Sequence, residues 1–351
     1  MPATTGWLVR GKDGRLTAYA PGDGHVLRWT ETRPGGPAWK GPEPLPAPDL
    51  LPYFSVAQGA DGYVHLVGTR RRPLSDGAAA HEIVYAIQYQ TGRPLREWRS
   101  LASPYPSDPS LAEKMGLPSA VVDGDGSLHV FIRNAGRGVT VRNQARTGAW
   151  NGWLDIKGRR VVGTASAALA GDGHLEILAP TSEVLQRWSW EKPGAPFARA
   201  DDVPLRVAPD SLTSVVTGED GGLTHFWHDA EDGTVRAWRP AEGEPARVGE
   251  GTGTGPVAVL RTDVDGHDCT VLAHRDRATG RPALAAYPTG NEEAGATWTL
   301  TGSPCLGAPS LALDGAGRVV MAAIGTDGAL WVARQKPEPG LALGAWEPAG
   351  S

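Results

Sequence analysis

One unit recurs along the chain, and it limits the fold more than any other feature of the sequence. The unit begins with a short apolar segment that ends in a glycine turn, as in "YFSVAQGADG" (53–62) and "PSLALDGAG" (309–317). Successive turn glycines are 45 to 51 residues apart, with one interval of 64; they are Gly14, Gly62, Gly126, Gly173, Gly221, Gly266 and Gly317. A recurring period of this size indicates a repeat architecture.

Each turn is followed by an alternating segment such as "SLHVFIR" (127–133), which is typical of a half-buried strand. A third strand follows, clearest in "GTDGALWVARQ" (325–335), and then an edge strand that often carries Trp, as in "GAWNGWLDI" (148–156). Asp-Gly favours two-residue hairpins in which both central residues have positive φ. Four strands in each of seven units predict an all-β protein, a seven-bladed β-propeller with four antiparallel strands per blade in a single domain.

The units also predict the blade boundaries. The first unit begins near the N-terminus and the last ends with a fourth strand, so we expect blade 7 to pack on blade 1 without exchanging a strand. The expected blades are residues 1–49, 50–116, 117–162, 163–209, 210–254, 255–306 and 307–351, with approximate limits.

Two units resemble a known family. "GRVVMAAIGTDGALWVARQ" (317–335) and "GSLHVFIRNAGRGVTVRNQARTGAWNGW" (126–153) are similar to the repeat of the PLL-like bacterial propeller lectins. The resemblance implies glycan binding in shallow pockets between blades, where an aromatic side chain stacks on a sugar. The polar positions of the present blades do not repeat, and "APTSEVLQRWSW" (179–190) in blade 4 departs from the pattern. We therefore expect one specialised site rather than a ring of equal sites.

Composition excludes several classes of partner. The formal net charge is -5 with acids and bases interspersed, so the basic face of a nucleic-acid-binding protein is missing and an acidic membrane surface is no better a partner. The apolar runs are too short to span a bilayer, and no signal peptide is recognised at the N-terminus. We expect a cytoplasmic protein, with release by a non-classical route and homodimer formation left open.

No motif for a cofactor or a metal stands out. "GEGTGTGP" (249–256) precedes a strand rather than a helix, so we interpret it as a link between blades and not as a dinucleotide loop. His225 and His228 are three residues apart on a strand and point to opposite faces, which argues against a zinc site. We therefore expect no cofactor and no metal.

Blade 2 carries two insertions, residues 68–81 and 103–118. Propeller geometry places both on the face where strand 2–3 loops and blade connections lie. Asp108 followed by Pro109 predicts the start of a helical turn over 110–115. The pair is read either as a lid over one side of the funnel or as drift of loop length, which costs little free energy.

Polar and aromatic side chains gather on that same predicted face, and they form our candidate site. For binding they are Arg70, Tyr105, Arg133, Asn134, Trp227 and Arg275, and for catalysis His228, Asp229 and His274. Arginine can hold a carboxylate or phosphate bidentately, and histidine can move a proton near neutral pH. Trp227 and Trp331 are the better stacking candidates, while we assign most other tryptophans to packing between blades.

Two functions follow, together with a weaker third. The first is a lectin-like protein that binds a carbohydrate or sugar-containing small molecule at one site on the funnel face. The second is a cofactor-independent lyase, cyclase or hydrolase that acts on a small anionic metabolite, with His228 and His274 as acid and base and arginine as anion clamp. The third is a platform for protein interactions. Binding is preferred over catalysis because no catalytic motif is present.

Overall fold

The structure is a computed structural model that describes residues 6–74, 79–218, 220–241 and 243–350. Almost all regular structure is strand, and the strand pairings are antiparallel in the five sheets from β5 to β27, as is that of β1 with β2. The chain divides into two compact units, which are described separately. One unit combines residues 1–20, 27–44 and 211–351, and the other combines 21–26 and 45–210. The single domain expected from the repeat stays a prediction.

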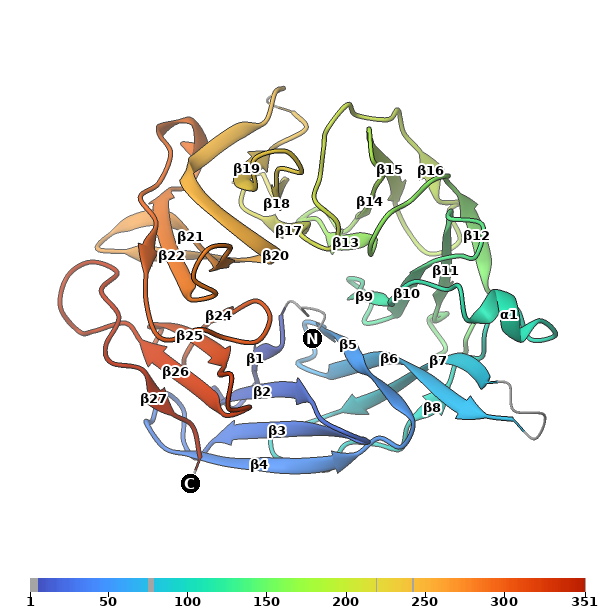
Figure 1. The fold of residues 1–351 in the computed structure, drawn as a ribbon, viewed down its shortest axis with the longest axis horizontal. Helices are drawn as coiled ribbons and strands as arrows, with labels where there is room; N and C mark the ends of the chain where they lie inside the picture. The colour runs from blue at the N-terminus through green and yellow to red at the C-terminus, as the bar shows by residue number, and fades with distance from the viewer. Residues whose placement is uncertain (1–5, 75–78, 219, 242, 351) are drawn as a thin grey trace. The chain divides into compact units, whose positions relative to one another are not determined.

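The first unit holds most of the N-terminal sheet and the whole C-terminal part of the chain (Figure 1). The N-terminal sheet contains β1 (Leu8–Arg10), β2 (Leu16–Pro21), β3 (His25–Glu31) and β4 (Trp39–Pro46). A seven-stranded sheet contains β17 (Thr213–Val216), β18 (Leu223–His228), β19 (Thr234–Trp238), β20 (Ala246–Val264), β21 (His267–Asp276), β22 (Pro282–Pro288) and β23 (Thr299–Leu300), with a 3₁₀ turn at Glu292–Ala294. The last sheet contains β24 (Ser310–Leu313), β25 (Val319–Ile324), β26 (Leu330–Arg334) and β27 (Glu347–Pro348).

The second unit contains three four-stranded sheets. The first contains β5 (Leu50–Gln58), β6 (Val64–Pro73), β7 (Ala79–Gln88) and β8 (Arg99–Ser100). The next contains β9 (Ser119–Val122), β10 (Leu128–Arg133), β11 (Val139–Asn143) and β12 (Leu154–Lys157). The third contains β13 (Ser166–Leu169), β14 (Leu175–Pro180), β15 (Leu185–Trp190) and β16 (Ala198–Arg199).

The long strand β20 explains why one sheet has seven strands. Its N-terminal part pairs with β19 and its C-terminal part with β21, so it is the fourth strand of one set and the first of the next. With β20 shared in this way, the described strands form seven sets of four. The prediction of an all-β fold built from four-stranded antiparallel sheets is confirmed.

The turn glycines follow the prediction with one correction. All seven have positive φ, between 75° and 90°. Only the turn at Asp265 and Gly266 is a two-residue hairpin with positive φ at both positions. In the others the glycine has positive φ and the residue directly before it does not, as where Gly14 N–H donates to Gly11 O and Gly11 N–H donates to Arg15 O. These are longer loops in which a type I turn is followed by a left-handed glycine, so the two-residue turn was wrong for them.

The two blade 2 insertions have different structures. Residues 68–73 continue β6, which pairs with β7 as far as Pro73 and Ala79, while 75–78 lie outside the described residues. The second insertion contains the predicted helical turn, α1 (Pro109–Ala112), whose N-cap Asp108 accepts hydrogen bonds from the backbone of Ser110 and Leu111. Whether the insertions act as a lid stays a prediction.

Apolar cores lie between successive sheets of each unit because a strand buries both of its faces. On β10, Val130 and Ile132 pack into a core shared with β5 to β7, whereas Phe131 packs into a core shared with β14 and β15. On β21, Leu272 faces the core of β18 and β19, and Val271 faces that of β24 and β25. Side chains alternate along a strand, so neighbouring residues enter different cores.

The N-terminal sheet packs on the C-terminal sheet within one unit, and no strand is exchanged between them among the described residues. Fully buried Glu31 is the centre of this contact. Its carboxylate accepts hydrogen bonds from Leu16 N at 2.9 Å and from Arg334 Nη2 at 2.7 Å. Arg334 also donates to Gly36 O, so one ion pair links residues about 300 positions apart.

We expect Glu31→Ala to lower the free energy of unfolding by about 3–5 kcal/mol, because Arg334 would keep only the more distant carboxylate of Asp314, at 4.0 Å, and the buried Leu16 N–H would lose its acceptor. Glu250→Ala removes the same side chain from an exposed pair with Arg247 and is expected to cost less than about 1 kcal/mol. Urea denaturation of both variants measures the difference. Equal losses would contradict a special role for Glu31.

Candidate functional site

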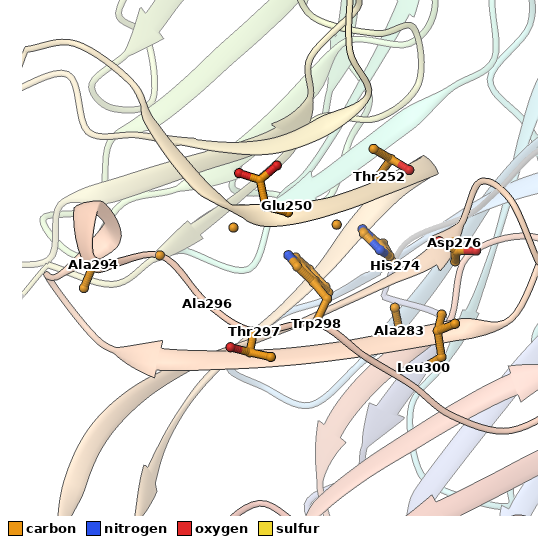
Figure 2. Close-up of a pocket in the computed structure, with 13 residues that line it drawn as sticks. Glu250, Thr252, His274, Asp276, Ala283, Ala294, Ala296, Thr297, Trp298 and Leu300 are labelled. Atoms are coloured by element: carbon orange, nitrogen blue, oxygen red, sulfur yellow. The ribbon is translucent and has the colours of Figure 1, made fainter.

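Two cavities in the first unit place polar groups beside tryptophan rings. The β20 cavity, of about 630 Å³, lies between the N-terminal part of β20 and the segment that leads into β23; it is lined by residues 249–252 and 294–298, with His274, Asp276, Ala283 and Leu300 (Figure 2). The Trp331 cavity, of about 350 Å³, is lined by Pro282, Ser303, Pro304, Cys305, Ala323, Gly325, Thr326, Asp327, Trp331 and Trp346. Both volumes suit small molecules.

The structure brings the two predicted histidines together. His228 is at the end of β18 and His274 lies on β21, and their facing atoms, Nε2 of His228 and Nδ1 of His274, are 3.4 Å apart. The other side of His274 stacks on Trp298, with ring centroids 4.0 Å apart and planes within 2° of parallel. Trp298 is anchored in turn because its indole N–H donates to Val248 O at 2.9 Å.

Three glycines of β20 allow this arrangement. Gly249, Gly251 and Gly253 lie in or next to the irregular part of β20, where its pairing with β19 shifts register and Gly249 has a φ of 76°. A Cβ at Gly251 would lie 2.5 Å from the Trp298 ring, and one at Gly253 would lie 2.4 Å from His228 Nε2 and 2.6 Å from His274 Nδ1. The segment "GEGTGTGP", expected to link two blades, is therefore the part of a strand that lies directly against the aromatic stack.

Burial keeps both histidines neutral. Desolvation lowers the pKa of His228 to about 3, with a further contribution from the neighbouring His274 and Arg277. Desolvation also lowers the pKa of His274 to about 4, against the opposing attraction of Asp276. Both values lie below the ordinary value of 6.5, so the facing nitrogens form a contact between neutral rings in which one nitrogen donates and the other accepts.

This burial predicts a loss of stability in mild acid. Below about pH 6.5 the unfolded chain binds protons that the folded histidines exclude, so the free energy of unfolding falls as pH falls, by up to about 1.4 kcal/mol per pH unit for each histidine. Urea midpoints measured at several pH values should show a shallower dependence for the double variant His228→Gln, His274→Gln. His267→Gln, at an exposed position, is the control and should keep the wild-type slope. An unchanged slope in the double variant would contradict the assignment.

The close approach of Gly253 to the two imidazoles predicts that a side chain at this position destabilises the fold. Gly253→Ala would push its Cβ into both imidazoles, and overpacking of this kind costs about 1–3 kcal/mol. Gly152→Ala is the matched control because its Cβ would meet no atom within 4 Å. Thermal unfolding of the two variants tests the close approach, and a Gly253→Ala variant as stable as the control would argue against it.

The Trp331 cavity lies between β22 and the β25–β26 hairpin. Two half-buried indoles, those of Trp331 and Trp346, line this cavity. Trp346 Nε1–H donates to Thr301 Oγ1 at 2.8 Å, and Trp331 Nε1–H lies 3.4 Å from Asp327 Oδ2. Asp327 is exposed and holds the turn by accepting a hydrogen bond from Ala329 N. The cavity thus combines aromatic faces with a carboxylate.

The other predicted residues of this unit have structural partners. Trp227 is only 1% exposed, so its ring offers no face to a ligand here. Asp229 accepts from Glu231 N and pairs with Arg236. Arg275 donates to Cys305 O at 2.9 Å, which places its guanidinium beside the connection to the next sheet.

The remaining predicted residues, Arg70, Tyr105, Arg133 and Asn134, belong to the second unit. Tyr105 OH accepts a hydrogen bond from Ala135 N at 3.0 Å, so the second insertion is tied to the loop that follows Arg133 and Asn134. Asn134 is buried and bonds to Gly138 N and Thr140 within its own turn. Arg70 forms an ion pair with Glu82 at 2.7 Å.

Several residues that line the two cavities were not predicted from the sequence. Trp298 and Trp346 were assigned to packing, yet each lines a cavity. The alternating glycines of "GEGTGTGP" were the available signal for Trp298, since a strand face without side chains leaves room for an aromatic ring. No comparable signal marked Ser303 or Glu250.

Known proteins resemble this chain in structure but not in sequence. No protein-family model matches the sequence, and no curated protein sequence matches it significantly. The BP39L lectin from Burkholderia pseudomallei is similar in structure, with a TM-score of 0.68 and 15% identity over 98% of this chain and 100% of its own. AofleA from Arthrobotrys oligospora has a TM-score of 0.55 and 11% identity, covering 99% and 94%.

A putative 6-phosphogluconolactonase from Bacteroides uniformis is also similar, with a TM-score of 0.59 and 14% identity over 96% of this chain and 97% of its own. These matches extend over nearly whole chains. The fold is a β-propeller. Since a lectin and a putative lactonase share it at such low identity, the fold by itself does not assign a function. No helix among the described residues is long and apolar enough to cross a membrane.

Proposed function

We propose that the protein is a lectin-like propeller that binds a carbohydrate, and that the Trp331 cavity holds the sugar. The observation that carries the proposal is the meeting of Trp331, Trp346 and Asp327 in one cavity of about 350 Å³. An indole face packs on the apolar face of a sugar ring, and a carboxylate accepts hydrogen bonds from its hydroxyls.

The position of the cavity supports the proposal. Its lining includes Asp327, in the turn between β25 and β26, and Ser303 and Cys305, in the connection from β23 to β24. Loops of this kind on a rigid scaffold commonly carry binding residues. The structural similarity to a propeller lectin and the resemblance of residues 317–335 to the PLL-like repeat point the same way.

Catalysis by the two histidines is the less supported function. Their contact at 3.4 Å favours a joint role, but pKa values of about 3 and 4 leave neither ring able to act as an acid near neutral pH. An efficient acid–base catalyst has a pKa close to the working pH. Binding therefore accounts better for the residues that face solvent.

The test is calorimetric titration of the protein with a panel of neutral monosaccharides and methylated sugars. We expect Trp331→Ala to weaken binding of the best ligand tenfold or more, since truncating an aromatic anchor costs about 2 kcal/mol or more. Trp331→Phe should recover part of the affinity, and Tyr89→Ala, which removes an exposed ring directly after β7, should have no effect. Absence of sugar binding to the wild type, or equal binding by Trp331→Ala, would overturn the proposal.

A further inference from the structure

A third cavity lies in the second unit, on the connection between β7 and β8. This β7–β8 cavity has a volume of about 540 Å³ and is lined by residues 89, 90, 93–97 and 99. Three of these residues are arginines, Arg93, Arg96 and Arg99, and Glu97 is the only acidic residue among them. The cavity is therefore basic, in a chain whose formal net charge is -5.

The backbone of the sheet holds two of these arginines in place. Arg96 N–H donates to Ile87 O at 2.9 Å, which continues the pairing beyond the end of β8. Arg99 belongs to β8 and is paired in register with Tyr85 of β7. Both side chains therefore extend from paired backbone, so their starting points are fixed before any ligand binds.

The same two guanidinium groups lack an anionic partner. Arg96 and Arg99 are exposed, and neither forms an ion pair within the part of the chain that the structure describes. The Arg96 guanidinium lies over the Tyr89 ring, 5.6 Å from its centroid, and Tyr63 packs edge-on against that ring with centroids 4.7 Å apart. The ring attracts the cation without using its N–H donors as a carboxylate would. Tyr89 thus positions Arg96 and leaves its hydrogen-bonding capacity to a ligand.

The number of arginines indicates the kind of anion. One guanidinium group can satisfy a carboxylate through two parallel N–H···O bonds, whereas a sulfate or phosphate ester presents three terminal oxygens. Three arginines around one cavity therefore favour the ester. The remaining lining residues suit an attached sugar, because Pro94 and Leu95 offer apolar contact while Gln90 and Glu97 can bond to hydroxyl groups.

We propose that the β7–β8 cavity binds the sulfate or phosphate ester of a monosaccharide. Arg96 and Arg99 hold the ester oxygens, and Arg93 adds a third positive charge. The volume of about 540 Å³ accommodates a sugar ring with its ester group. The site is additional to the proposed neutral-sugar site and does not depend on it. It lies on the connection from the third to the fourth strand of its sheet, whereas the Trp331 cavity includes the turn between the second and third strands of another.

The experiment uses the Trp331→Ala variant, which removes the proposed neutral-sugar site. Glucose 6-sulfate, glucose 6-phosphate, glucose and inorganic sulfate are each titrated calorimetrically into this protein. We expect at least one ester to bind tenfold or more tightly than both glucose and inorganic sulfate, and added salt to weaken its binding. Absence of ester binding, or glucose binding as tight as that of the esters, would overturn the proposal. Inorganic sulfate binding as tightly as the esters would also overturn it, since the cavity would then recognise the anion alone.

Two double variants locate the binding. Arg96→Gln with Arg99→Gln should weaken ester binding tenfold or more, because the charged hydrogen-bond donors are lost from exposed positions that the fold does not need. Arg146→Gln with Lys157→Gln is the matched control, since it removes the same charge from exposed side chains elsewhere in the second unit and should leave ester binding unchanged. Ester binding that is indifferent to the loss of Arg96 and Arg99, or that falls equally in the control, would overturn the proposal. None of these results depends on whether a neutral sugar binds at Trp331.

Discussion

Burial of both faces of each small sheet is the constraint on which the rest of this structure depends. A four-stranded sheet cannot cover its own apolar faces, so within each unit a sheet must share cores with the sheets beside it. Phe131 and its neighbours Val130 and Ile132 show this directly, because they enter two different cores from one strand. The same requirement brings the last sheet against the first, where Glu31 and Arg334 form a buried ion pair.

Both cavities arise where that shared packing is incomplete. At β20, three glycines remove the side chains that would otherwise fill the space, and Trp298 and His274 occupy part of it. At Trp331, a short turn and a sheet connection leave two indoles half covered. The sheets hold the two indoles of the Trp331 cavity in place, which lowers the entropic cost of the sugar binding proposed there.

The histidines illustrate how tertiary structure changes the meaning of a residue. Two histidines at equivalent strand ends suggest acid–base chemistry when only their ordinary pKa is considered. Full burial makes the charged form unfavourable, so the rings remain neutral and serve the packing of Trp298 and β20. Trp227 changes in the same way, from a stacking candidate in the sequence to a core residue in the fold.

The sequence by itself determined the repeat, the strand alternation and the glycine turns, because these depend on local backbone preferences and on the period of side chains along a strand. It also indicated Trp331 and the meeting of His228 with His274, since equivalent positions of adjacent repeats lie side by side. Only the tertiary structure decided which tryptophans face a cavity and which are buried. That outcome depends on the glycines and side chains of other strands, such as Gly251 of β20 beside Trp298. These residues lie far from the ring in the chain, and a glycine carries no chemical signal of its own.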